Sequence, residues 1–327
     1  TPTEVVERHG LPRPFRAGSL PGMDMATLDE LRIVLDPIGQ AAIAVALVLV
    51  MFSVALGLKA RDFTLLADEP RLFFGGVMAQ VLGLPALTLA ILSLVSLPPS
   101  IALGMIVVAC CPGGAVSNLM TFLGKGNVAY SVSLTAASSV LAALLTPASI
   151  LFWSNLYPPT AALLESLDVS PLVFLTQTML LLLLPLTAGM LVAWRWPVVA
   201  AWFRRWTALA GGTVLGAVVV YGVVSFYPVL GPALPLLGSV AVLHNAAAFA
   251  FGGLAGIALK ADRASTRTLV FEIGIQNSGL AIVILIGQLE GVGGAAAIAA
   301  TWGVWHLVAG GIIVSYLRFM DRRAYAS

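Results

Sequence analysis

LVFEIGIQNSGLA, residues 269–281, lies in the middle of an apolar run that is long enough to cross a membrane. The stretch holds a carboxylate at Glu272, amides at Gln276 and Asn277, and two glycines. A charged side chain at the centre of a bilayer costs about 2.5–3.5 kcal/mol on insertion scales. A bound cation, a proton or a basic partner therefore has to compensate Glu272, and we favour a cation.

The composition around this stretch is that of a helical membrane protein. The 327 residues are 59% hydrophobic and 10% charged, and the mean hydropathy is +0.99; soluble domains carry about 25% charged residues. Only helices and closed barrels satisfy their backbone groups in lipid, and the apolar runs lack the alternation of barrel strands. No basic patch suits nucleic acid, and the adjacent Cys110 and Cys111 exclude a disulfide framework.

The sequence predicts an all-α polytopic protein with short loops. The nine expected membrane spans are 38–57, 72–96, 99–123, 127–153, 171–194, 207–227, 233–258, 265–288 and 293–317. Residues 1–37 form a polar tail, in which Thr27-Leu28-Asp29-Glu30 has the pattern of a capping box and predicts a short interfacial helix. Residues 318–327 form a C-terminal tail.

The basic residues alternate between the two ends of these spans. They lie in every second loop and in the C-terminal tail, at Lys59, Arg61, Arg71, Lys125, Arg195, Arg204, Arg205, Lys260, Arg263, Arg267, Arg318, Arg322 and Arg323. The opposite loops carry neither Lys nor Arg. The positive-inside rule then places the C-terminus in the cytoplasm and the N-terminus outside, in a multi-pass protein of the plasma membrane (the inner membrane of a bacterial cell).

Two spans are predicted to be broken helices. Span 99–123 carries Pro112, Gly113 and Gly114 at its middle, and span 265–288 carries its polar cluster at the same depth. Proline removes a backbone donor and glycine relaxes the chain. The spans on either side of each break match, and the two triplets run in opposite directions. Such inverted pairs of interrupted segments mark the midplane site of a secondary transporter, where free carbonyls suit a cation and helix N-termini suit an anion.

Each polar residue also has a simpler interpretation. Pro-Gly-Gly can be a plain kink, and Glu272 can pair with His244 or His306, which are both intramembrane. Small hydroxyl residues often pack membrane helices, and Gln80 can form a single interhelical hydrogen bond. The combination of these features favours a transport site over the separate explanations.

At these residues the sequence resembles the bile acid:sodium symporter family. The matching stretches are Gly57-Leu58-Lys59, Asp62-Phe63, Ala79-Gln80, Cys110 through Asn118, Gly126-Asn127, Leu144 through Pro147, His244-Asn245, Glu272 through Gly279, and Trp305-His306. The resemblance implies a core domain with two crossed discontinuous helices, from residues 72–153 and 233–317, and a panel domain from residues 38–57 and 171–227. It implies the nine-span form of the animal members, without the first span of many bacterial relatives.

The resemblance also implies the ligands of two Na+ ions. The first ion would use Ser117, Asn118, Ser131, Thr135 and Glu272. The second would use Gln80, Glu272, Gln276 and backbone carbonyls near Ile273 and Ile275. Substrate would contact Gly114, Ala115, Asn277 and His306. The family often has a hydroxyl residue at the position of Ala115, and some relatives have an amide at that of Leu307, so substrate contacts differ there.

We therefore expect a sodium-coupled symporter that carries a small organic anion by alternating access and acts as a monomer. The anion would be bile-acid-like or a small carboxylate. The first alternative keeps the fold and makes Glu272 a proton carrier. A channel or a sensor on the same fold is a second alternative. An intramembrane enzyme is a third, but the sequence has no His-Glu-x-x-His motif, nucleophile elbow or paired acids, and we predict that the protein is not an enzyme.

Overall fold

A computed structural model of the chain describes residues 26–33, 37–59, 62 and 68–326, and within them the elements are helices. In chain order these are α1 (Ala26–Glu30), α2 (Pro37–Leu56), α4 (Pro70–Met78), the π-helical turn η2 (Ala79–Gly83), α5 (Leu84–Leu94), α6 (Pro99–Cys110), α7 (Ala115–Leu123), α8 (Val128–Leu156), α9 (Pro158–Ser166), α10 (Pro171–Arg195), α11 (Pro197–Leu230), the 3-10 turn η3 (Gly231–Ala233), α12 (Leu234–Ala258), α13 (Arg263–Gly274), α14 (Ser278–Gly287) and α15 (Gly293–Ala326). The expected all-helical class is confirmed.

Seven helical segments in the described part of the chain are long and apolar enough to cross a membrane. They are Pro37–Leu56, Pro70–Leu94, Val128–Leu156, Pro171–Arg195, Pro197–Pro228, Gly231–Ala258 and Gly293–Arg323. The shorter helices α6 and α7 form one interrupted pair between two of these segments, and α13 and α14 form another. The structure is therefore that of a polytopic membrane protein in which two helix pairs are broken near their middles.

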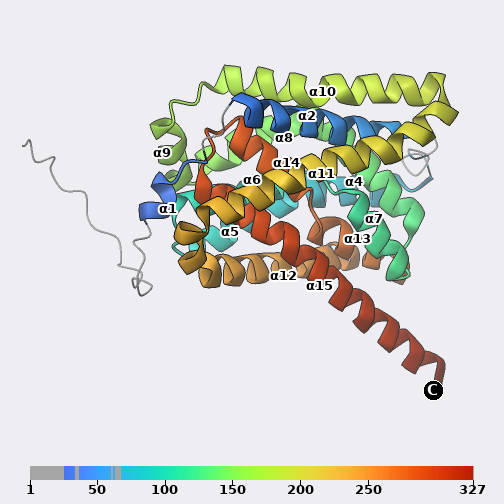
Figure 1. Cartoon of the computed structure of the whole chain (residues 1–327). Coiled ribbons are helices and arrows are strands. Elements are labelled where there is room, and N and C mark those ends of the chain that lie inside the picture. The colour runs from blue at the N-terminus through green and yellow to red at the C-terminus, as the bar shows by residue number, and fades with distance from the viewer. Residues whose placement is uncertain (1–25, 34–36, 60–61, 63–67, 327) are drawn as a thin grey trace, which may run out of the picture.

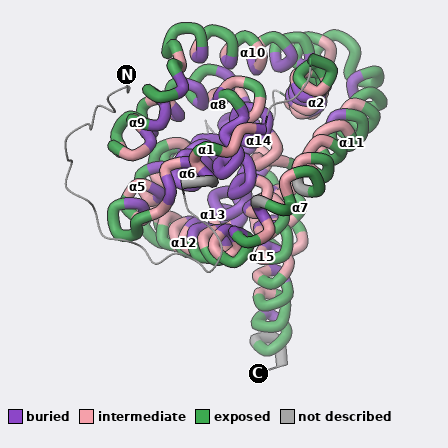
Figure 2. Tube along the Cα trace, turned by 60° about the vertical axis from the view of Figure 1, so that its left-hand side comes forward, coloured by how far each residue is buried: buried purple, intermediate pink, exposed green. Residues whose placement is uncertain are grey.

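The helices form an interior group and an outer group. In Figure 1, α2, α10 and α11 lie together along one side, and α2 packs closely against both of the others. Figure 2 shows that α6, α13 and α14 are largely buried. Every residue of α6 from Ser100 to Cys110 is buried. The two interrupted pairs thus lie in the interior, where lipid does not reach their free backbone groups.

The outer helices present apolar side chains away from the protein. On α11 the exposed residues include Trp202, Trp206, Val220 and Tyr227. An exposed apolar face of this length is typical of contact with lipid. The tryptophans lie beside Arg204 and Arg205 at the start of α11, the pairing of aromatic and basic residues that occurs at a membrane–water interface.

The N-terminal helix differs from the prediction. Helix α1 begins at Ala26, so Thr27 lies inside it and is not the cap that a capping box requires. Leu28 is fully buried, and the Asp29 carboxylate accepts a hydrogen bond from the backbone N–H of Ser100 at 2.8 Å. The helix packs on α6 and α15 through Leu28, whereas Glu30 is exposed, and its position at the membrane interface stays a prediction. The rest of the expected N-terminal tail, residues 1–25 and 34–36, lies outside the described residues.

Three helix limits also differ from the prediction. Helix α11 begins at Pro197, ten residues before the expected span. Its first turns can carry Arg204 and Arg205 because long basic side chains extend from a helix to the aqueous interface. The expected tail 318–327 is instead the continuation of α15 as far as Ala326. The loop after α8 is not a short connection, since it contains α9. Hydropathy predicts only the part of a helix that lies in lipid. The helix itself extends as far as its backbone hydrogen bonds do, which can be well beyond the lipid.

The extended end of α15 is held by a cluster of charges. The Asp321 carboxylate accepts hydrogen bonds from Arg267 at 2.6 and 2.9 Å and from Arg263 at 3.0 Å. Arg267, which is buried, also donates to the carbonyl of Gly124 at 3.0 Å. Arg318 donates to the carbonyl of Leu123 at 2.8 Å. The end of α15 thereby holds the end of α7 and the start of α13 together.

We expect Asp321→Asn to lower the melting temperature of the detergent-purified protein by several degrees. The substitution leaves the buried guanidinium of Arg267 without its counter-charge, and breaking such a pair is destabilising. The matched control is Arg322→Gln, which removes a charge from the adjacent exposed residue and is expected to leave the melting temperature unchanged. Equal melting of the two variants would show that the cluster does not stabilise the fold.

Candidate functional site

The two interrupted helix pairs meet at their breaks and are joined there by backbone atoms. Gly113 and Gln276 form an antiparallel bridge. The N–H of Asn277 donates to the carbonyl of Pro112 at 2.8 Å. Each break therefore supplies the backbone partners that the other lacks, which is how non-helical backbone persists at membrane depth. Residues 112–114 therefore lie beside residues 272–277.

Glu272 lies beside this joint, in the last turn of α13. It is fully buried. Its Oε1 accepts a hydrogen bond from the Ser131 hydroxyl at 2.5 Å, and its Oε2 accepts one from the Thr135 hydroxyl at 2.9 Å. Ser131 and Thr135 are four residues apart on α8 and so share a face. This spacing allows both hydroxyls to donate hydrogen bonds to the same carboxylate.

The oxygens around Ser131 outnumber the available protons. Its Oγ lies 2.5 Å from Glu272 Oε1 and 2.7 Å from Asn118 Oδ1, yet a hydroxyl has one hydrogen to donate. The Thr135 hydroxyl also lies within reach of both acceptors, at 2.9 Å from Glu272 Oε2 and 3.3 Å from Asn118 Oδ1. A group of oxygens that faces inward with too few donors is suited to a hard cation.

Two further hydroxyls border this group. Ser117 is fully buried, and its Oγ donates to the Gly114 carbonyl at 2.6 Å. Thr121 is fully buried and its Oγ1 lies 3.2 Å from Ser131 Oγ. Thr121 is not among the site residues that the sequence predicts. The signal was its position four residues after Ser117, which puts the two hydroxyls on one face of α7.

The end of α13 brings carbonyls to the same place. The last carbonyls of a helix have no partner within it. The Glu272 carbonyl accepts from the side-chain amides of Gln80 and Gln276 at 3.1 and 3.2 Å, and the Ile273 carbonyl accepts from Gln276 at 2.8 Å. The Gly274 carbonyl accepts from Asn245 at 2.6 Å. Side-chain amides thus supply the hydrogen-bond donors that the last carbonyls of α13 lack within the helix.

Gln80 reaches this end of α13 from the π-helical turn η2. Pro85 follows that turn, and a proline leaves the carbonyl four residues before it without a backbone donor. Single π-turns occur frequently at functional sites. Gln80 is buried, and its Oε1 has no hydrogen-bond partner within the described structure. An unpaired oxygen on a buried amide that contacts the end of α13 is a candidate cation ligand.

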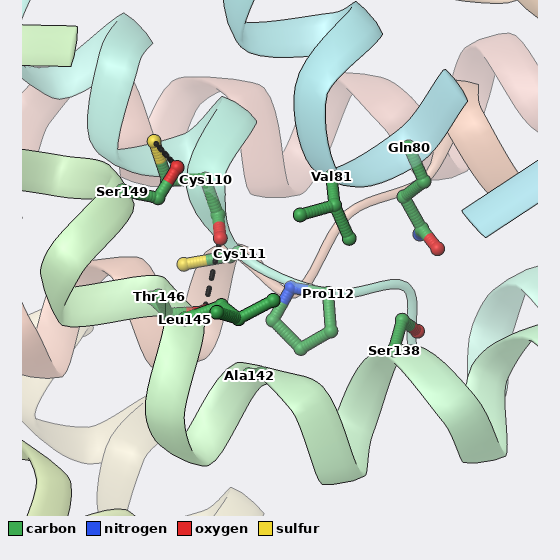
Figure 3. Close-up of a pocket in the computed structure, with 10 residues that line it drawn as sticks. All are labelled: Gln80, Val81, Cys110, Cys111, Pro112, Ser138, Ala142, Leu145, Thr146 and Ser149. Atoms are coloured by element: carbon green, nitrogen blue, oxygen red, sulfur yellow. Dashed lines mark hydrogen bonds between the residues drawn. The ribbon is translucent and has the colours of Figure 1, made fainter. Parts of the chain in front are cut away.

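A small cavity adjoins Gln80 on the α6 side of the break. It is lined by residues of η2, of the end of α6 and of α8. Figure 3 shows α8 holding the end of α6 there, because Thr146 donates to the Cys110 carbonyl at 3.0 Å and Ser149 lies 3.3 Å from the Cys110 sulfur. Thr146 of α8 therefore supplies a hydrogen-bond donor to the Cys110 carbonyl, which has no backbone partner because α6 ends there.

The predicted substrate residues surround the other side of the joint. Gly114 is partly exposed and Ala115 is exposed at the start of α7, which has no side-chain cap. Asn277 caps α14, because its Oδ1 accepts from the N–H of Leu280 at 3.0 Å. His306 is buried on α15, and its contact with substrate stays a prediction. The first three residues lie together at two helix N-termini, whose N–H groups suit an anion.

The histidines have other partners than Glu272. The Nε2 of His244 lies 2.8 Å from the Thr88 hydroxyl, and its ring makes an edge contact with Trp302. Among the described residues, the ion pairs join Asp321 to Lys125, Arg263 and Arg267. The expected alternative in which Glu272 pairs with a histidine therefore has no support from the geometry.

Known proteins resemble the chain over most of its length. The model of the Sodium Bile acid symporter family matches residues 44–229. The uncharacterized sodium-dependent transporter YocS of Bacillus subtilis (strain 168) is 33% identical over 283 residues, which cover 84% of this chain and 82% of that protein. The chain belongs to the sodium bile acid symporter family. The family comprises transporters, so the chain is a transporter homologue and not an enzyme.

Other members of the sodium bile acid symporter family are more distant. The probable sodium/metabolite cotransporter BASS1, chloroplastic, of Arabidopsis thaliana is 30% identical over 84% of this chain and 66% of its own length. The ileal sodium/bile acid cotransporter of Homo sapiens is 26% identical over 77% of this chain and 71% of its own length. Their names describe sodium-dependent carriers of different solutes.

Proposed function

We propose that the chain is a sodium-coupled symporter of an organic anion. The observation that carries the proposal is the fully buried carboxylate of Glu272, which is surrounded by oxygens and lies beside helix carbonyls. A buried charge is costly unless it is paired, and no basic side chain pairs with it in the described structure. A cation from solution is the remaining partner, and sodium is the one that the names of the relatives specify.

We propose two sodium positions on either side of Glu272. The first is formed by side-chain oxygens of Ser117, Asn118, Ser131 and Thr135 with the carboxylate. The second is formed by Gln80, Gln276, the Glu272 carboxylate and backbone carbonyls near Ile273 and Ile275. In the structure the side-chain nitrogens of Gln80 and Gln276 face the Glu272 carbonyl. A rotation of each amide group by 180° would turn its oxygen toward this position instead, where it can bind a cation. The carboxylate then serves both ions.

We propose that the anion binds at the starts of α7 and α14. The negative charge would meet the free N–H groups of α7 near Gly114 and Ala115 and the amide of Asn277. The N-terminus of a half-helix pointing at an anionic group recurs in transporters. Sodium at the adjacent site adds positive charge, so binding of the two solutes is coupled electrostatically. We infer an amphipathic monoanion as the substrate.

We propose nine membrane passages, counting each interrupted pair as one. The core domain comprises α4 to α8 and α12 to α15, and the panel domain comprises α2, α10 and α11. The basic residues at the end of α10, the start of α11 and the end of α15 support a cytoplasmic C-terminus and an outside N-terminus by the positive-inside rule. Rocking of the panel against the core gives alternating access, and the transporter acts as a monomer.

The first experiment is thermal unfolding of the detergent-purified protein in sodium, potassium and choline chloride at equal ionic strength and pH. A solute that binds only the folded state stabilises it by about 2.7 kcal/mol at 100 times its dissociation constant. We expect a higher melting temperature in sodium than in the other two salts. A panel of carboxylates and sulfates is then screened in sodium, and a monoanion that adds to the stabilisation identifies the substrate class.

A proton is the second candidate for the coupling ion. The observation that favours it is the absence of a basic partner for Glu272 in the described structure, because a proton neutralises the carboxylate as a cation does. Equal melting in the three salts, with melting that depends on pH, would support proton coupling and contradict sodium coupling.

A further inference from the structure

A cavity opens at the end of the protein where α13 begins. It has a volume of about 500 Å³ and is lined by the starts of α4 and α13, the end of α12 and the residue before α8. Its charged residues are Glu69, Arg71, Lys260 and Asp262. Asn127 and Ser265 also line it, and the Asn127 side chain donates to the Ser265 hydroxyl at 3.3 Å. This hydrogen bond closes the inner wall of the cavity.

Two facing stripes of polar residues lead from this wall to the carboxylate. On α13, Ser265, Thr268 and Glu272 follow one another at spacings of three and four, which places them on one face. Opposite them, Asn127, Ser131 and Thr135 are spaced by four along α8 and its cap.

Hydrogen bonds join the two stripes at successive levels. Thr268 donates to the Asn127 carbonyl at 3.0 Å, one turn deeper than the bond between Asn127 and Ser265. Ser131 and Thr135 then contact the Glu272 carboxylate at 2.5 and 2.9 Å. Thr268 and the Asn127 carbonyl therefore lie between the cavity wall and the two hydroxyls that contact Glu272.

Gly126 allows the side chains of Thr121 and Thr268 to approach the same point of the backbone. A Cβ atom at position 126 would lie 2.8 Å from the Thr121 methyl carbon and 3.0 Å from Thr268 Oγ1. Thr121 and Thr268 are fully buried. The Thr121 hydroxyl contacts Ser131 at 3.2 Å. Thr121 therefore presents its hydroxyl to Ser131 and its methyl group to Gly126.

We propose that these residues form a sodium passage between α8 and α13, with a transient cation position at Thr268 and the Asn127 carbonyl. Sodium leaves the first site by this passage and enters the cavity at Asn127 and Ser265. The proposal rests on the proposed symport and adds to it a route for the cation. The intermediate position supplies two oxygens to the ion, the Thr268 hydroxyl and the Asn127 carbonyl, which lie 3.0 Å apart.

The passage is separate from the path of the organic anion. The start of α14 faces α11, because a Cβ atom at Gly279 would lie 2.8 Å from a methyl carbon of Leu215. The predicted substrate residues Gly114, Ala115 and Asn277 belong to the same side of the joint. The polar stripes lie between α8 and α13, behind the carboxylate. The cation and the anion are released through different openings, and the anion cannot obstruct the departure of sodium.

The test measures binding and release of ²²Na+ by the purified full-length protein in detergent, with rapid filtration after dilution into choline chloride. Thr268→Val removes the hydroxyl and keeps the shape of the side chain. We expect its dissociation rate to fall about tenfold, a barrier increase of about 1.4 kcal/mol, while the dissociation constant stays within about twofold. The matched control is Thr266→Val on the same helix, whose hydroxyl lies against α12, and its rate should equal that of the wild type.

The possible results separate the passage from the proposed function. Absence of ²²Na+ binding by the wild type overturns both. Binding by the wild type with equal dissociation rates in Thr268→Val overturns the passage alone. Weaker equilibrium binding in Thr268→Val at an unchanged dissociation rate also overturns it, because Thr268 would then be a ligand of the stable site. If Thr268→Val does not fold, Ser265→Ala at the cavity wall is measured instead, and slower release is again expected.

Discussion

Glu272→Gln is expected to abolish the sodium-specific rise in melting temperature. The substitution keeps the size of the side chain and removes the charge that attracts the ions. A 100-fold loss of affinity corresponds to about 2.7 kcal/mol. At a sodium concentration of 100 times the wild-type dissociation constant, the remaining stabilisation would be about 0.4 kcal/mol. Thermal unfolding in sodium, potassium and choline chloride measures this loss, and sodium-dependent uptake in proteoliposomes should disappear with it.

The same variant is expected to melt no lower than the wild type in choline. Without sodium the wild type keeps a buried carboxylate that is held only by hydroxyl donors, and the neutral amide avoids the cost of burying a charge. The matched control, Glu165→Gln, removes an exposed carboxylate on α9 and should keep the full response to sodium. A sodium response in Glu272→Gln equal to that of the wild type would disprove the assigned role.

Gly113→Ala is expected to weaken sodium binding at least tenfold and to destabilise the fold. The added Cβ would lie 2.9 Å from Gln80 Nε2 and 3.0 Å from Glu272 Oε2, so a ligand of each predicted sodium position must move. Overpacking of a closely packed interior costs about 1–3 kcal/mol. The measurement is the sodium dependence of melting, together with the melting temperature in choline.

The adjacent glycine supplies the control for this effect. A Cβ atom at Gly114 meets no atom within 4 Å, and its φ of −137° is available to any residue. Gly114→Ala should therefore keep the sodium response, whatever it does to the anion. If both alanine variants responded to sodium like the wild type, the close approach of Gly113 to the carboxylate would have no role in cation binding.

The sequence predicts the two helix interruptions because each is caused by residues at the interruption itself. Pro112 with two glycines breaks one pair, and a polar cluster flanked by Gly274 and Gly279 breaks the other. The structure brings the two breaks together, and Ser131 and Thr135 contact both Glu272 and Asn118; their role as sodium ligands stays a prediction. Hydroxyls at a spacing of four could be assigned to one helix face without knowing the fold.

Features that depend on contacts between distant segments were not predictable. Thr121 gains its importance from Ser131 on another helix, and the burial of Leu28 depends on α6 and α15. The charges at Arg204 and Arg205 predict a loop, whereas the helical backbone of α11 continues through them. The π-turn that carries Gln80 follows from Pro85, but a proline alone does not distinguish such a turn from a kink.

The joint between the breaks is made by main-chain atoms of Pro112, Gly113, Gln276 and Asn277. Main-chain hydrogen bonds do not depend on which side chain a residue carries. Substitution at the exposed Ala115, a proposed substrate contact, is therefore expected to alter solute preference while the two breaks stay aligned. A shared scaffold of this kind allows carriers of unlike solutes to diverge without rebuilding their ion coupling.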